Sequence, residues 1–175
     1  MDVIRAAHLA REGLALWRTQ KLADAAKLYE EVIAHADPGH WETPLYHQQF
    51  AGVLADLGRD VDALGQFQKA LELEQNQGGD EAGAAVSISR YFLAQHLARM
   101  KEPSAALDVL APSLIVGGKV EALLRMVQAE CLWQVGQLDE ARAAAQRALD
   151  RAPAIQRGKI EARLAVMLGQ SGLSE

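Results

Sequence analysis

The apolar residues of this chain recur at intervals of three and four positions from one end to the other, which is the spacing of amphipathic α-helices. No run of four or more alternating β-branched and aromatic residues indicates a half-buried strand. Turn-forming residues interrupt the helical pattern at residues 20–21, 37–41, 58, 78–79, 101–103, 117–118, 136 and 152–153. The pattern therefore predicts an all-α protein of about nine helices, formed as four antiparallel pairs and one final helix.

Prolines mark two predicted helix starts and one predicted irregularity. Thr43 before Pro44 is expected to be an N-cap with proline in the first helical turn, and Pro103 is expected to open a later helix in a similar way. Pro112 falls inside the apolar run ALDVLAPSLIV. Because proline removes a backbone donor and crowds the preceding turn, that helix is predicted to kink or end early.

Small residues recur at matching places in the four predicted pairs, and this indicates an internal repeat. An alanine holds the equivalent position in the second helix of each pair, at Ala25, Ala63, Ala106 and Ala141. Small side chains let neighbouring helices approach closely, and larger ones fill the remaining space. The predicted repeats span residues 6–39, 44–77, 87–120 and 122–155, and a helix at about 154–170 is predicted to cap the last pair, as the end of a repeat array requires.

The repeated segments resemble a known family. QKLADAAKLYEEVI, GRDVDALGQFQKALEL and GQLDEARAAAQRALDRAP are similar to the second helix of the tetratricopeptide repeat (TPR), and the resemblance covers residues 6 to about 155. It implies a right-handed superhelical solenoid in a single domain, residues 1–175. The four alanines are 38, 43 and 35 residues apart, whereas the family repeat is about 34 residues, so the longer units resemble the lengthened repeats of bacterial regulatory proteins. The third unit has Lys101 in place of the turn glycine.

The resemblance also implies a binding surface, because in this family the first helices of successive pairs line a concave groove that holds ligands. Large amphipathic side chains in such a groove suit the anchoring of a peptide. The residues carried over to this groove as protein-binding candidates are Leu14, Trp17, Arg18, Gln48, Asp56, Tyr91, Gln95, Arg99, Met126, Glu130 and Trp133.

Several of these candidates have a second interpretation. Trp17 and Trp133 each follow a leucine expected in the core, so each ring either faces the groove or packs into a helix junction. The chaperone adaptors of the family hold a carboxylate with lysine and asparagine on the first groove helix, where this chain has Ala10 and Leu14. A carboxylate clamp of that type is therefore not expected, and an apolar or extended ligand is favoured.

Composition and charge narrow the function classes. The chain has 175 residues, of which 50% are apolar, enough for one domain with a continuous core. It has 7 basic and 14 acidic residues up to Ser87, and 11 basic and 9 acidic residues from Ile88. A nucleic-acid-binding protein would need a clustered basic face, which this profile argues against. Charges interrupt the N-terminal apolar residues, so we expect no signal peptide and no membrane span, and by default a cytoplasmic protein.

The sequence contains no recognised pattern for catalysis or metal binding. No serine lies in a glycine-flanked elbow, the glycine-rich stretch at 78–83 has no lysine, and the five histidines do not show HxxxH or HExxH spacing. The lone Cys131 lies in an apolar helical stretch and is expected to be a buried thiol. We therefore expect no enzymatic activity, no cofactor and no metal site.

The leading hypothesis is a non-enzymatic adaptor or scaffold that binds a peptide or helix of a protein partner in the concave groove. The acidic balance and the length also fit a secretion-type chaperone for an export client. The acidic front and mildly basic rear of the chain favour a third hypothesis, a homo-oligomeric structural module assembled head to tail.

Overall fold

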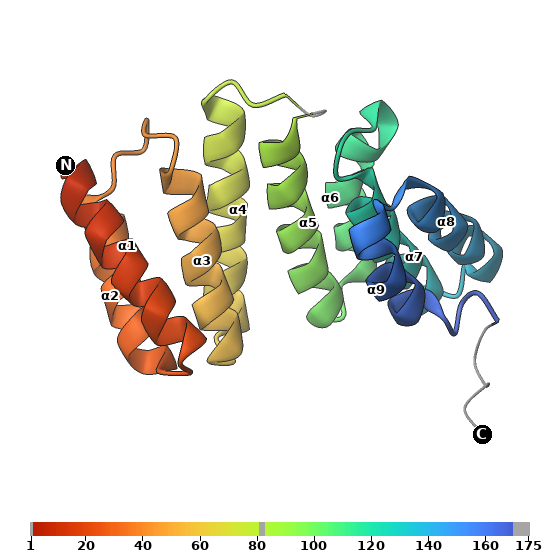
Figure 1. Cartoon of the computed structure of the whole chain (residues 1–175), viewed down its shortest axis with the longest axis horizontal. Helices are drawn as coiled ribbons and strands as arrows, with labels where there is room; N and C mark the ends of the chain where they lie inside the picture. Colours follow the sequence, from red (N-terminus) through yellow and green to blue (C-terminus); the bar gives the residue numbers. More distant parts are fainter. Residues whose placement is uncertain (1, 81–82, 170–175) are drawn as a thin grey trace. The chain divides into compact units, whose positions relative to one another are not determined.

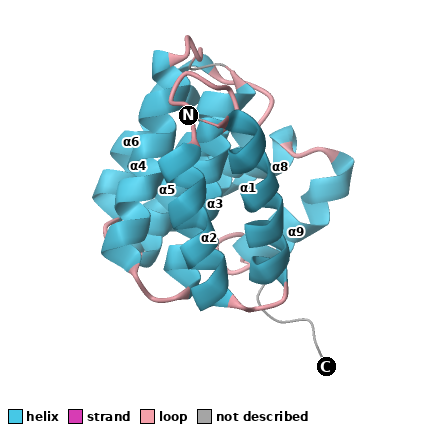
Figure 2. Cartoon of the chain, turned by 90° about the vertical axis from the view of Figure 1, so that its left-hand side faces the viewer, coloured by secondary structure: helices cyan, strands magenta, loops and turns pink. Residues whose placement is uncertain are grey.

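The computed structural model describes residues 2–80 and 83–169, and within these ranges all regular structure is helical (Figures 1 and 2). The helices of the described residues are α1 (Val3–Arg18), α2 (Leu22–His35), α3 (Thr43–Asp56), α4 (Asp60–Asn76), α5 (Ala84–Arg99), α6 (Pro103–Val116), α7 (Glu121–Gln134), α8 (Leu138–Arg151) and α9 (Ala154–Leu164). The predicted all-α fold of four helix pairs and one further helix is confirmed.

The helices form two compact units. Unit 1 is Met1–Gly79 and contains α1 to α4, and unit 2 is Asp80–Glu175 and contains α5 to α9. In unit 1, α1 packs against α2, α2 against α3 and α3 against α4. In unit 2, α5 packs against α6, and α7 packs against α5, α6 and α8. Each unit therefore has its own core, and consecutive helices are neighbours within it.

The short turns inside the four pairs share one backbone conformation. Gly58 and Gly136 have φ of 75° and 81°, and Gln20 and Lys101 hold the same left-handed region with φ of 60° and 67°. A residue in this region ends a helix by turning the chain sharply, and glycine does so without steric cost. Lys101 thus replaces the turn glycine of the third pair without changing the type of turn.

The predicted N-cap at Thr43 and the predicted early helix end at Pro112 were wrong, whereas Pro44 lies in the first helical turn as predicted. Thr43 is the first residue of α3, and its hydroxyl donates a 2.6 Å hydrogen bond to the carbonyl oxygen of Asp37, so it closes the preceding loop. Helix α6 does not end at Pro112 but continues to Val116, and its last turns bury Ser113 and Leu114. Packing of these side chains outweighs the loss of one backbone donor at the proline.

Tyr29 is one of the largest fully buried side chains of unit 1. Its side chain is fully buried, its ring stacks on Phe50 at 6.2 Å between centroids, and its hydroxyl donates a 3.0 Å hydrogen bond to Oε1 of Gln49. Burial raises the pKa of Tyr29 to about 12. A Cβ on Gly13 would lie 3.0 Å from Cε2 of this ring, which explains why α1 has a glycine where it crosses Tyr29.

Unit 2 ends in a short helix. Helix α9 packs against α7 and α8 and buries Ile160 and Leu164. The helix ends at Leu164, and turns follow as far as Gly169. Position 170, the last residue of the predicted capping helix, lies outside the described residues.

A buried histidine makes the stability of unit 1 depend on pH. His47 on α3 is buried, and its Nδ1 lies 2.7 Å from Oε1 of Gln66 on α4. Burial lowers the pKa of His47, an effect that the hydrogen bond to Gln66 only partly opposes. The unfolded chain therefore takes up a proton on this side chain at a higher pH than the folded protein does.

We predict that the free energy of unfolding falls as the pH is lowered through the ordinary histidine range, near 6.5, because the unfolded state then binds more protons. For one group the slope is at most about 1.4 kcal/mol per pH unit. Urea unfolding of the wild type and of His47→Gln between neutral pH and pH about 5 measures it. The variant should show a shallower slope, and equal slopes in the two proteins would contradict the assignment.

Candidate functional site

Two of the predicted groove residues of unit 1 bind each other. Nε1 of Trp17 on α1 donates a 2.7 Å hydrogen bond to Oδ2 of Asp56 on α3. The indole ring lies over Gly52, where a Cβ would overlap the ring carbon Cη2. Trp17 is half-buried, so it packs at the junction of α1 and α3 and still presents part of its surface to solvent. The other unit 1 candidates lie on the same two helices: Leu14 and Gln48 are half-buried and Arg18 is exposed.

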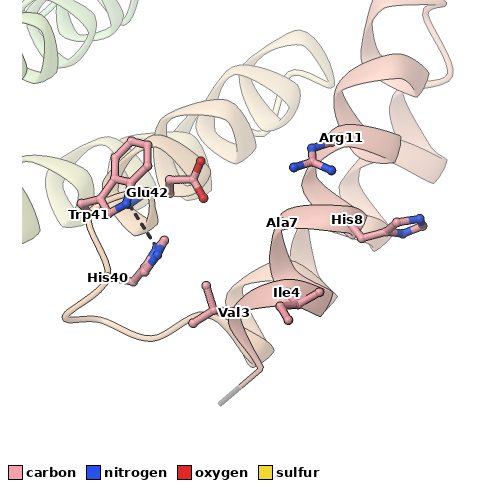
Figure 3. A pocket seen from close by; sticks show the side chains of 8 residues that line it. All are labelled: Val3, Ile4, Ala7, His8, Arg11, His40, Trp41 and Glu42. Carbon is pink, nitrogen blue, oxygen red and sulfur yellow. Dashed lines mark hydrogen bonds between the residues drawn. The ribbon is translucent and has the colours of Figure 1, made fainter.

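A cavity of about 300 Å³ opens at the N-terminal end of α1, and sequence reasoning missed it. It lies between the first turns of α1 and the loop that precedes α3 (Figure 3). Two large apolar side chains at this cavity are exposed, Trp41 by 72% and Ile4 by 85%. Its lining residues are Val3, Ile4, Ala7, His8, Arg11, His40, Trp41 and Glu42.

Some polar groups of this cavity already have hydrogen-bond partners among the described residues, and others are free to bind a ligand. Glu42 accepts a 2.9 Å hydrogen bond from the hydroxyl of Tyr46, and burial together with this carboxylate raises the pKa of Tyr46 to about 12. Nδ1 of His40 accepts a 3.4 Å bond from the backbone N–H of Glu42, which fixes the loop next to Trp41. The guanidinium of Arg11 makes no ion pair within the part of the chain that the structure describes. The cavity therefore offers apolar surface and one cation that a ligand carboxylate could pair with.

The unit 2 candidates divide into three groups. Met126 is only 4% exposed and belongs to the core, so it offers almost no surface to a partner. Trp133 is half-buried and Arg99 is exposed on its own helix, where Nη2 lies 3.2 Å from Nδ1 of His96. The remaining candidates, Tyr91, Gln95 and Glu130, converge on a side chain from α9.

That side chain is Arg163, which the sequence prediction did not include. Its Nη2 donates a 2.8 Å hydrogen bond to Oε2 of Glu130, and its Nε donates a second to Oε1. With the amide oxygen of Gln95 turned toward the guanidinium, that oxygen accepts from Nη1 at 3.1 Å, from Nη2 at 3.2 Å and from the hydroxyl of Tyr91 at 3.2 Å. The unit 2 candidates thus surround a guanidinium from the same chain.

Cys131 and the side chains of the types that bind metals are further candidate functional groups of the described residues. Cys131 is buried, as expected, and burial raises the pKa of its thiol to about 11. At neutral pH very little of the reactive thiolate is therefore present. Across residues 2–80 and 83–169, no three histidine, cysteine, aspartate or glutamate side chains gather in a way that could hold a metal ion. No helix among these residues is long and apolar enough to cross a membrane.

Comparison with solved structures decides the fold. MamA from Desulfovibrio magneticus RS-1 has 18% sequence identity and a TM-score of 0.67, over 95% of this chain and 94% of that chain. YrrB, described as a TPR protein with an unusual peptide-binding site, has 18% identity and a TM-score of 0.61, over 93% and 82%. A tetratricopeptide repeat protein from Parabacteroides merdae has 18% identity and a TM-score of 0.69, over 94% and 59%. This chain has the tetratricopeptide-repeat fold. No protein-family model and no curated protein sequence matches it.

In a tetratricopeptide-repeat fold each pair supplies a first and a second helix, so α1 and α3 are the first helices of unit 1 and α5 and α7 those of unit 2. The two polar clusters described above both lie on first helices: Trp17 and Asp56 on α1 and α3, and Tyr91, Gln95 and Glu130 on α5 and α7. The open cavity lies beside α1 as well. First helices therefore carry both polar clusters, whereas Trp41 of the cavity lies in the loop before α3.

The contact between Trp17 and Gly52 in this tetratricopeptide-repeat fold gives a direct test. We predict that Gly52→Ala lowers the free energy of unfolding by about 1–3 kcal/mol, because the added methyl group displaces the indole ring. Gly65→Ala on α4 is the control, since a Cβ there meets open space, and it should raise stability by about 0.5–1 kcal/mol through helix propensity. Chemical denaturation measures both, and equal changes in the two variants would contradict the packing of Trp17 on α3.

Proposed function

We propose that this protein is a non-catalytic protein–protein interaction module that binds a peptide or helix of a partner at the α1 face of unit 1. The observation that carries the proposal is the exposure of Trp41 and Ile4 on either side of a preformed cavity of about 300 Å³. Large apolar side chains in such positions are typical of binding sites, because they gain contact area that water cannot supply.

The chemistry of the cavity selects the kind of segment that it accepts. Val3, Ile4 and Trp41 form an apolar lining that suits an aliphatic or aromatic side chain. The guanidinium of Arg11, which forms no ion pair with another described residue, lies at the same cavity and suits a carboxylate. The proposed ligand is therefore a short peptide segment with an apolar anchor followed or preceded by an acidic group.

For an acidic ligand, direct contact with Arg11 matters more than the net negative charge of the N-terminal half. Charges more than about 8–10 Å apart across solvent are largely screened at physiological salt, whereas a guanidinium in contact with a carboxylate is not. Glu42, the acidic residue of the lining, is already hydrogen-bonded to Tyr46. Glu42 keeps its negative charge, so a ligand carboxylate at the cavity binds where it contacts Arg11 and stays apart from Glu42.

The proposed binding surface continues along the first helices of unit 1. Leu14, Trp17, Arg18 and Gln48 lie on α1 and α3 and keep part of their surface exposed, and the bond to Asp56 fixes the ring of Trp17. Rigid aromatic groups bind at a smaller entropic cost than mobile ones. YrrB, which has the same fold, is described as having an unusual peptide-binding site, and this supports the proposal that the ligand is a peptide.

We predict that peptides selected on the immobilised wild type from a random phage-displayed library carry an apolar residue next to an acidic one. Trp41→Ala and Arg11→Ala should each weaken their binding by about ten-fold or more, the range of an interface hot spot. Val61→Ala and Lys27→Ala are matched controls, since both side chains are exposed on α4 and α2 and neither lines the cavity. Isothermal titration calorimetry measures the affinities.

Two results would overturn the proposal. One is a set of selected peptides whose affinity is unchanged by Trp41→Ala and Arg11→Ala. The other is a failure to select any peptide, together with a dimer in sedimentation that Trp41→Ala abolishes, which would make a second copy of this chain the occupant of the cavity.

A further inference from the structure

The α5 and α7 face of unit 2 holds a guanidinium in a geometry typical of specific recognition. Two parallel hydrogen bonds join Arg163 to the carboxylate of Glu130, one of them 2.8 Å long. This fork pairs a planar cation with a planar anion and is more specific than contact with a point charge. Glu130 is mostly buried, with 19% of its side chain exposed, so its carboxylate is aimed at this one partner.

Two further residues complete the site. Gln95 and Tyr91 lie one helical turn apart on α5, so their polar ends meet. With its amide oxygen assigned toward the guanidinium, Gln95 accepts from both terminal nitrogens. Partial burial lowers the pKa of Arg163, but the hydrogen bonds and charges of Glu130 and Tyr91 raise it, with the net effect upward. The four side chains come from three helices of unit 2.

The helix that delivers Arg163 is held weakly. Helix α9 has 11 residues, and of these only Ile160 and Leu164 are buried. Its start lacks a side-chain cap, it contains Gly158, and Ile155 at its first turn is 89% exposed. A glycine within a helix and a start without a side-chain cap both lower helix stability. Short segments with few buried contacts open locally well before the rest of a protein unfolds.

We propose that Tyr91, Gln95 and Glu130 form a guanidinium-recognition site, that α9 fills this site with Arg163 of the same chain, and that an arginine-bearing segment of a partner protein competes for it when α9 opens. The proposal uses unit 2 alone and does not rest on the function proposed for unit 1. It differs from a purely structural role for the ion pair, because a structural pair would hold α9 in place but would not bind an arginine supplied by another chain.

The test uses the full chain and a synthetic peptide that copies residues 154–169, acetylated and amidated, as the probe. In the wild type the tethered α9 competes with the peptide, whereas Arg163→Ala removes the competing guanidinium from the host. We predict that the Arg163→Ala protein binds the peptide at least ten-fold more tightly than the wild type does, by fluorescence anisotropy of a labelled probe. Arg157→Ala is the matched control, because Arg157 is an exposed arginine of the same helix, and it should bind like the wild type.

Two further measurements assign the binding to the guanidinium. Adding Glu130→Gln to the Arg163→Ala host should abolish the gain, and a peptide that carries Arg163→Lys should lose it too, since an ammonium cannot form the fork. Hydrogen exchange of the α9 amides should be about ten-fold faster in Arg163→Ala than in Arg157→Ala, which shows that the pair holds the helix.

The proposal is overturned if the Arg163→Ala host binds the peptide no better than the wild type does, whether or not exchange of α9 is faster. That result would leave the pair with a purely structural role. It is also overturned if the lysine peptide binds as well as the arginine peptide, or if Glu130→Gln leaves the gain unchanged, because recognition would then not involve the carboxylate fork.

Discussion

Close approach between helices, made possible by residues with little or no side chain, is the constraint on which both units depend. Ala25 and Ala63 in unit 1 and Ala106 and Ala141 in unit 2 have no exposed surface. A larger residue at such a place would push two helices apart and open gaps around them, which a close-packed interior does not tolerate without cost. Gly13 and Gly52 play the same part on the first helices. There the neighbour that comes close to the glycine is an aromatic ring and not the backbone of another helix.

That constraint also determines where binding groups can be placed. Once the junctions are filled by small residues, the larger polar and aromatic side chains of the first helices are left at the edge of the core. In unit 1 these groups are partly open to solvent. Arg11, which lines the cavity beside Trp41, forms no ion pair with another described residue. In unit 2 the corresponding groups are engaged by Arg163. The same fold thus provides one face that is open and one that its own chain occupies.

Much of the fold could be predicted from the sequence, because its signals are local. Glycine, proline and polar residues mark the ends of helices within a few positions, and the spaced alanines identify the repeat. The predictions of an N-cap at Thr43 and of an early helix end at Pro112 were wrong. A hydrogen bond to Asp37 decided the first and packing of Ser113 and Leu114 the second, and neither contact is visible in a local pattern. Lys101 takes the left-handed turn of a glycine, which sequence alone left open.

The candidate sites could be predicted less well, since they depend on register between helices. Trp17 and Asp56 were both named, but their hydrogen bond depends on how α1 lies across α3. Met126 is buried on α7, although its spacing places it on the same helical face as Glu130. The cavity at Trp41 depends on the path of a loop, and the role of Arg163 depends on where a final helix docks. A tryptophan in an otherwise polar loop was the one available signal for the cavity.

The three tryptophans provide the most direct test of the central claim, that a partner segment binds at the open face of unit 1. Each indole N–H gives its own NMR resonance, from Trp17 bonded to Asp56, from Trp41 at the cavity, and from Trp133 on α7. On titration with a selected peptide, the account predicts that the Trp41 resonance shifts most while the Trp133 resonance stays in place. A shift of the Trp133 resonance with Trp41 unmoved would contradict it.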